Sequence, residues 1–239
     1  MNIGETNPAL AKGFKEATHD STTMSISGTI VKILILLAIV ACAFVYSWFY
    51  IPYSAGIMMV VSLLTFVVAM FTTFSPKNAQ FSAVIYAAFE GLFLGSISKF
   101  FNNFYPGIVL PAILLTIVAV LVTVFIYGKR PSIADRTRKG VMIALTTIVV
   151  TSLIGIVLSW FGIILPIYNN GIIGIVFSLA VVVVATISLM QDYDFILRGA
   201  QSGAPKYMEW YAAFGLMVTL IWLYMEILQL LAKIFSNND

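Results

Sequence analysis

Four acidic residues lie within long apolar stretches of this sequence, where an ionised side chain is costly to keep. Glu90 interrupts AVIYAAFEGLFLGSIS, and Glu226 lies in the middle of IWLYMEILQLL. Asp192 and Asp194 share the stretch ISLMQDYDFILRGA. A carboxylate at the centre of a bilayer costs at least about 2.5–3.5 kcal/mol. Such a residue must face the interior of a helix bundle, find a partner or stay protonated, and these settings suit the binding of protons or cations.

Helix geometry separates the roles of Asp192 and Asp194. Residues two apart on an α-helix point about 200° away from each other, so both cannot face one site. Asp194 and Arg198 have the i,i+4 spacing with the acid first, which favours an ion pair. We therefore expect Asp192 to face the bundle interior and Asp194 to turn toward Arg198 or toward water.

Glu90 is surrounded by small residues. Gly91 and Gly95 form a small-xxx-small pair, which allows another helix to approach closely. Glu90 is therefore predicted to face protein rather than lipid. The other acidic residues are assigned to tails, connectors or a basic loop: Glu5, Glu16, Asp20, Asp135, Glu209 and Asp239.

None of the apolar runs has a basic residue at its centre, so the acids within them lack a built-in counter-ion. Carboxyl groups in such a cluster share protons or attract a cation. The sequence favours an acid-lined path for protons or for calcium, with Asp192 and Glu226 as transient calcium ligands and no resident cofactor. The structural alternative is that each acid stays protonated and is satisfied by a Tyr, Ser or backbone group.

The composition is that of an integral membrane protein. Hydrophobic residues make up 61% of the chain and charged residues only 10%, against about 25% charged in soluble domains. A single cysteine, Cys42, excludes an intramolecular disulfide, and a single histidine, His19, excludes a histidine-rich metal site. With so few cysteines and histidines, the chain is not expected to be a zinc enzyme or to use a Cys–His nucleophile pair.

Apolar runs of about 20 residues are long enough to cross a bilayer as helices. They predict an all-α, polytopic seven-helix bundle, a single domain over residues 29–239 that follows a polar cytoplasmic tail at 1–28. The alternative is six crossings with one re-entrant segment. The predicted helices lie near residues 31–51, 56–74, 81–101, 107–128, 141–164, 171–191 and 211–235.

Basic residues are unevenly divided between the two ends of these helices. Only Lys99 and Lys233 fall at one end. The positive-inside tendency therefore places the N-terminus in the cytoplasm and, after seven crossings, the C-terminus outside. The loop 128–140 is interpreted as a topology anchor rather than as an anionic-lipid or nucleic-acid site, because no aromatic residues are interleaved with its charges. The basic residues of the other end are Lys12, Lys15, Lys32, Lys77, Lys129, Arg130, Arg136, Arg138, Lys139, Arg198 and Lys206.

QDYDFI at 191–196 and LYMEILQLL at 223–231 resemble the last two helices of the Bax inhibitor family, also called the transmembrane Bax inhibitor motif family. YAAFEGLFLGSIS at 86–98 is similar to the family's third helix. The opening NPAL and the segment beginning GAPKYMEWY look closest to a bacterial branch with an extended N-terminal tail. The resemblance covers roughly residues 30–235.

The resemblance implies a non-enzymatic, pH-sensitive calcium leak channel in the bacterial plasma membrane. Asp192 takes the position of the acid in helix six and Glu226 that of the acid in helix seven, and the path is closed when the two share a proton. Glu90 is a possible third member. Some bacterial members have basic residues at the end of helix two that latch the helix-six acid. Here FTTFSPKNAQ has only Lys77 and no arginine, so such a latch is either absent or rebuilt from Lys77 or Arg198.

Two other functions fit the same sequence less closely. A scaffold that binds other membrane proteins would use the helix faces rich in Ala, Gly and Ser. An intramembrane aspartyl-type protease would need two acids at equal depth around a hydrated cavity. The helix-seven acid here is a glutamate, and residue counting places it and Asp192 at unequal depths.

Overall fold

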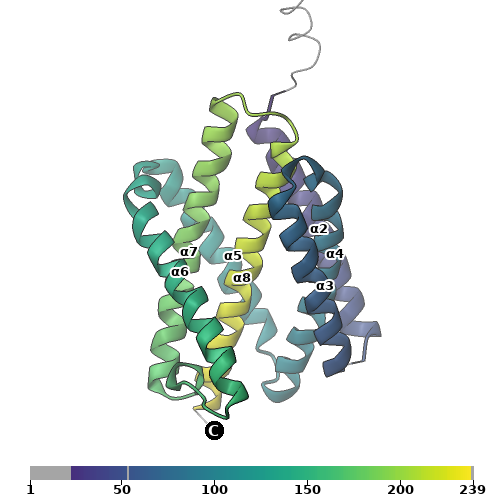
Figure 1. Ribbon diagram of the computed structural model, residues 1–239, viewed down its shortest axis with the longest axis vertical. Coiled ribbons are helices and arrows are strands. Elements are labelled where there is room, and N and C mark those ends of the chain that lie inside the picture. Colours follow the sequence, from purple (N-terminus) through teal and green to yellow (C-terminus); the bar gives the residue numbers. More distant parts are fainter. Residues whose placement is uncertain (1–22, 53, 238–239) are drawn as a thin grey trace, which may run out of the picture.

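The computed structural model describes residues 23–52 and 54–237. This part of the chain contains seven helices long and apolar enough to cross a membrane, which confirms the predicted all-α fold (Figure 1). Two short 3-10 turns, η1 (Pro76–Asn78) and η2 (Pro166–Tyr168), lie in connectors. The seven helices are α2 (Ile26–Tyr50), α3 (Ala55–Phe74), α4 (Ala79–Phe104), α5 (Val109–Lys129), α6 (Ser132–Trp160), α7 (Ile172–Gln201) and α8 (Met208–Ser236).

Several helices extend beyond the apolar runs that predicted them. α6 begins at Ser132, directly after Pro131, so the interpretation of 128–140 as a loop is wrong for most of its length. Proline before the first turn and Asp135 within it both suit a helix start. α7 likewise continues to Gln201 rather than ending near residue 191. Hydropathy marks the segment that crosses hydrocarbon, whereas polar turns prolong the helix outside it.

The start of the chain is also revised. α2 begins at Ile26, where Ser25 caps the helix by accepting a hydrogen bond from the Gly28 amide. The predicted polar tail at 1–28 therefore ends earlier than expected, and its residues 1–22 lie outside the described residues.

α8 is the central helix of the bundle (Figure 1). It packs against α2, α4, α5 and α7, and side chains from several of its faces are buried, among them Ala213, Met217, Leu223 and Leu228. α6 is peripheral: it packs mainly on α7. The hydrophobic core is thus arranged around α8, which carries one of the predicted acids.

α2 and α4 pack closely at the two glycines noted in the sequence. A Cβ atom on Gly91 would lie 2.5 Å from the Val40 carbonyl oxygen, and one on Gly95 would collide with the Phe44 carbonyl. Beside them, the Ser47 hydroxyl donates a hydrogen bond to the Leu92 carbonyl at 2.7 Å. The small-xxx-small pair therefore serves packing within one chain.

Glu209 belongs to α8 rather than to the connector assigned from the sequence. It lies in the first turn of the helix and is only 1% exposed. Its carboxylate pairs with Lys32 of α2 at 2.5 Å and accepts hydrogen bonds from the backbone amide and hydroxyl of Ser25, at 2.9 and 3.0 Å. The contact ties the start of α2 to the start of α8. Hydropathy missed it because Glu209 precedes the apolar run.

Candidate cation and proton site

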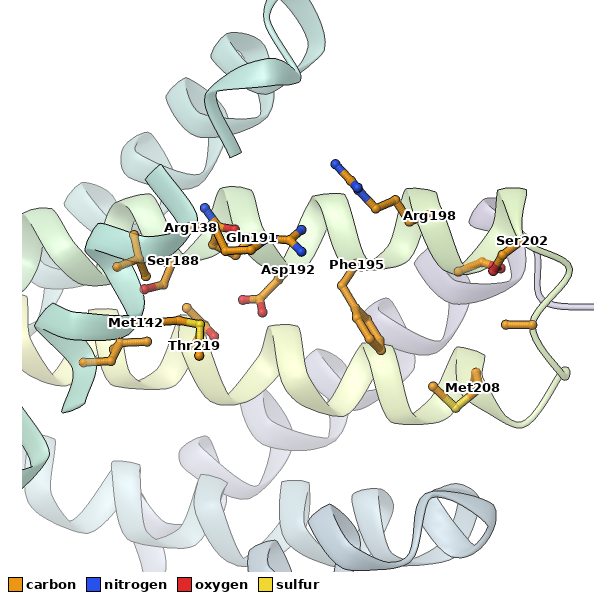
Figure 2. Close-up of a pocket in the computed structure, with 14 residues that line it drawn as sticks. Arg138, Met142, Ser188, Gln191, Asp192, Phe195, Arg198, Ser202, Met208 and Thr219 are labelled. Atoms are coloured by element: carbon orange, nitrogen blue, oxygen red, sulfur yellow. The ribbon is translucent and has the colours of Figure 1, made fainter. Parts of the chain in front are cut away.

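Asp192 lies inside α7 and points toward α8. Figure 2 shows its carboxyl group between the two helices, facing the side of α8 that carries Thr219. The Asp192 Oδ2 atom is fully buried and has no hydrogen-bond partner in the described residues. The expectation that Asp192 faces inward agrees with this placement. A buried carboxyl oxygen without a partner is uncommon, because the desolvation it suffers is not offset.

Two cavities meet at Asp192. The larger, of about 620 Å³, lies between α6, α7 and α8, and Gln191 and Thr219 also line it (Figure 2). The smaller, of about 360 Å³, lies between α3, α7 and α8 beside Thr73 and Gly215. The side chain of Asp192 is therefore reached from both sides of the contact between α7 and α8.

Glu226 lies further along the same groove. It lines a cavity of about 460 Å³ between α6, α7 and α8, and its Oε1 atom accepts a hydrogen bond from Trp222 Nε1 at 3.0 Å. This cavity shares Leu145, Ser188 and Thr219 with the larger one, so the two adjoin. Asp192 and Glu226 thus belong to one groove.

The two predicted acids do not touch. Glu226 lies seven residues beyond Thr219, which is about 10 Å along the axis of α8. No hydrogen bond joins the Asp192 and Glu226 carboxyl groups in the part of the chain that the structure describes. A proton shared directly between them, which the resemblance implies for a closed path, is absent from this conformation.

Lys233 is a cation held in place beyond the Glu226 end of the groove. It follows Glu226 by seven residues on α8, and its ammonium group donates to the carbonyl oxygens of Ile167 and Gly174, at 3.1 and 3.3 Å, and to the Ser178 hydroxyl at 2.8 Å. These bonds hold the charge in place between the end of α8 and the beginning of α7.

Asp194 has a different environment, being clamped by two arginines. It is 4% exposed, and its Oδ2 atom lies 2.7 Å from both Arg198 Nε and Arg138 Nη2. The Tyr127 hydroxyl donates to its other oxygen at 3.3 Å, and Arg198 also pairs with Asp135 at 2.6 Å. The pair with Arg198 matches the i,i+4 expectation. Arg138, from α6, was not predicted.

Of the alternatives for a latch, the one through Lys77 is not formed in the described residues. Lys77 is exposed in η1 and forms no ion pair with a described acidic residue. Arg138 and Arg198 hold Asp194 instead, and the Gln191 amide strengthens the same contact by donating to the Ala134 carbonyl of α6 at 2.8 Å. Asp194 and Gln191 therefore fasten α7 to α6.

Glu90 lies on the other side of α8. It is 9% exposed on the face of α4 where Tyr86 packs edge-on against Phe214, with ring centroids 5.1 Å apart, and where Ser98 hydrogen-bonds Tyr224 at 2.7 Å. α8 stands between α4 and α7 (Figure 1). The structure therefore does not bring Glu90 into the groove with Asp192.

Comparison with known families agrees with this architecture. A family model described as "Bax inhibitor 1 like" matches residues 7–236. The chain belongs to this family. Comparisons with curated proteins and with solved structures gave no match.

In this Bax inhibitor 1-like protein, the acids of the groove do not form a resident metal site. The described residues contain no group of three or more His, Cys, Asp or Glu side chains that could hold a metal ion. Asp192 and Glu226 can each contribute carboxylate oxygens singly, with hydroxyls such as Thr219 nearby. Single carboxylates suit brief binding of a hard cation rather than a permanent cage.

Proposed function

We propose that this membrane protein passes cations, calcium among them, along the groove between α6, α7 and α8. Asp192 and Glu226 act as successive binding carboxylates, and their protonation stops passage. The observation that carries the proposal is the buried, unpartnered Oδ2 atom of Asp192 at the junction of two cavities. Thr219 is a hydrogen-bonding neighbour of the Asp192 carboxyl group, so only Oδ2 is left unpaired. An ionisable group inside a membrane bundle that keeps one oxygen unpaired is best explained by a role in moving ions or protons.

The spacing of the two acids supports passage rather than storage. Conduction needs sites that bind an ion well enough to admit it and weakly enough to release it. Asp192 lies level with Thr219, and Glu226 lies about 10 Å further along the axis of α8. Two single carboxylates spaced in this way meet the requirement better than one multidentate cage. A protonated carboxyl group has lost the charge that attracts calcium, so acidification should slow passage.

Asp194 does not bind the ion in this scheme. Its carboxylate is already paired with Arg138 and Arg198, and Asp135 balances the second of these cations. Two arginines and two aspartates make this cluster neutral as a whole. The cluster instead holds α6 against α7 and so sets the width of the groove beside Asp192.

The geometry does not favour a hydrolase. Aspartyl-type chemistry needs two carboxyl groups that share one proton, and Asp192 and Glu226 are separated by about two turns of α8. We further propose that the end of the bundle with the arginine cluster faces the cytoplasm of a bacterial cell. The C-terminus then lies outside, as the distribution of basic residues favours.

The test is calcium flux into proteoliposomes that contain a calcium-sensitive dye. We expect parent protein to leak calcium more slowly at about pH 5 than at about pH 8, and Asp192→Asn and Glu226→Gln each to lower the flux and flatten this pH dependence. Asp20→Asn makes the same acid-to-amide change at a residue that does not belong to α6, α7 or α8 and should behave as the parent. If both groove variants leak like the parent across this range, the proposal is wrong.

A further inference from the structure

The groove between α6 and α8 is open along one side. Both helices pack on α7, and α6 packs mainly there, so the cavities between α6 and α8 are floored by α7. Val149 on one rim is 56% exposed, and Trp222 lines the other wall. Because these helices span the membrane, the open side faces the hydrocarbon of the bilayer.

One end of the groove has hydrogen-bond donors to spare and lies beside a basic segment, because residues 129–140 contain five basic residues and one acid. The side chains of Arg138 and Arg198 are 48% and 51% exposed, and both line the larger cavity. The ion pairs of Arg138 to Asp194 and Asp135 use Nη2 alone, which leaves its Nε and Nη1 donors for another group. A guanidinium with donors available is well suited to bind a phosphate.

The apolar part of the groove extends away from its charged end. The cavity beside Glu226 follows α6 from Leu145 to Leu153, which spans about 12 Å. Apart from Ser152, Ser188, Thr219 and Glu226, the side chains that line it are apolar. An open apolar surface of this length suits contact with part of an acyl chain.

We infer that an anionic phospholipid covers the open side of the groove, with its phosphate at Arg138 and Arg198 and one acyl chain along the rims of α6 and α8 against Val149 and Trp222, so that Glu226 stays accessible to cations behind it. The charged end matches the headgroup, and the apolar length matches the chain. The lipid supplies the wall that α6 and α8 leave open. This inference does not depend on cation conduction, because it concerns occupancy of the groove and is measured by binding.

Trp222 provides a direct reporter of an acyl chain in the groove. Brominated acyl chains quench tryptophan fluorescence on contact, so a chain with Trp222 as its single tryptophan (Trp48, Trp160 and Trp210 replaced by Phe) is reconstituted with brominated phosphatidylglycerol or brominated phosphatidylcholine. We expect half-quenching at a roughly fivefold lower fraction of the anionic lipid, the ratio that one interfacial arginine contributes. A matched chain that keeps only Trp160, which is 79% exposed at the other end of α6, should show no headgroup preference.

Two variants separate headgroup binding from chain binding. Arg138→Gln combined with Asp194→Asn removes both charges of one ion pair and should abolish the preference for phosphatidylglycerol. Val149→Phe narrows the groove and should reduce quenching of Trp222 by both lipids. Ile154→Phe, on a side of α6 that does not line the groove, should leave it unchanged.

Three results would overturn the inference. The first is equal quenching of Trp222 by the two headgroups in the parent. The second is the absence of quenching by either lipid, which would mean that water or protein fills the groove. The third is a headgroup preference that survives the loss of Arg138 and Asp194.

Discussion

Arg138 of α6 and Asp194 of α7 are joined by a 2.7 Å ion pair although 56 residues separate them in the sequence. Asp194 is buried while Arg138 is half-exposed, so the pair reaches from the surface of the bundle into its interior. α6 has few other neighbours apart from α7. This contact therefore contributes to the attachment of α6 to α7, together with the hydrogen bond from Gln191 to Ala134, and lies beside the groove that contains Asp192.

Arg138→Gln should lower stability by about 1.5–3 kcal/mol, the usual worth of a hydrogen bond to a charged group. The loss is moderate because Asp194 keeps its pair with Arg198. Thermal unfolding in detergent measures it. Arg136→Gln is the matched control, because Arg136 is exposed on the same helix and forms no ion pair with a described acidic residue. A variant as stable as this control would contradict the structural role of Arg138.

Lys32→Met should destabilise the protein by about 2–5 kcal/mol, because it leaves the Glu209 carboxylate buried without its cation. The double variant Lys32→Met/Glu209→Gln should recover much of that loss, since no buried charge remains. Melting temperatures of the three proteins measure the effect, and Lys77→Met serves as the control at an exposed lysine in η1. Equal melting temperatures for the single and double variants would argue against a buried ion pair.

Local spacing predicted those contacts that lie within one helix. Asp194 and Arg198 are four residues apart on α7, and that pair was expected. The partner of Glu209 is 177 residues away, and neither hydropathy nor spacing connects them. One signal was available: an acid immediately before an apolar run suits the first turn of a helix, where the dipole favours negative charge. That signal locates Glu209 on α8 but cannot name Lys32.

The number of helices was predictable because bilayer thickness sets their length. The residues at which the helices end were not predictable, and the end of α7 changes the geometry expected for the site. Extending α7 to Gln201 places Asp192 well inside a helix, where it faces Thr219 rather than Glu226. Whether Glu90 joins these acids depends on which helix occupies the centre of the bundle. α8 takes that position through many weak packing contacts that no short motif encodes.

Gly95→Ala should force α2 and α4 apart at the Phe44 carbonyl and cost about 1–3 kcal/mol, the range for overpacked positions. Gly140→Ala is the control, because a Cβ atom there meets no atom within 4 Å and alanine is the better helix former. The two variants should therefore shift the melting temperature in opposite directions. A Gly95→Ala protein whose melting temperature equals or exceeds that of the parent would show that the two helices have room to adjust.

Lys233→Met should speed calcium passage, if calcium follows the groove past Glu226. Lys233 lies about 10 Å beyond Glu226 along α8, held by Ile167, Gly174 and Ser178. At that distance, even at the dielectric constant of water, the repulsion between one positive charge and a divalent ion is about 0.8 kcal/mol. This repulsion lowers the occupancy of the Glu226 site by calcium about fourfold. Proteoliposome flux should rise by at least that factor in Lys233→Met and stay at the parent rate in Lys233→Arg.

Lys99→Met removes a lysine from the same end of the bundle, on α4 and away from the groove, and should change little. Equal rates for Lys233→Met and Lys99→Met would show that calcium does not pass this charge.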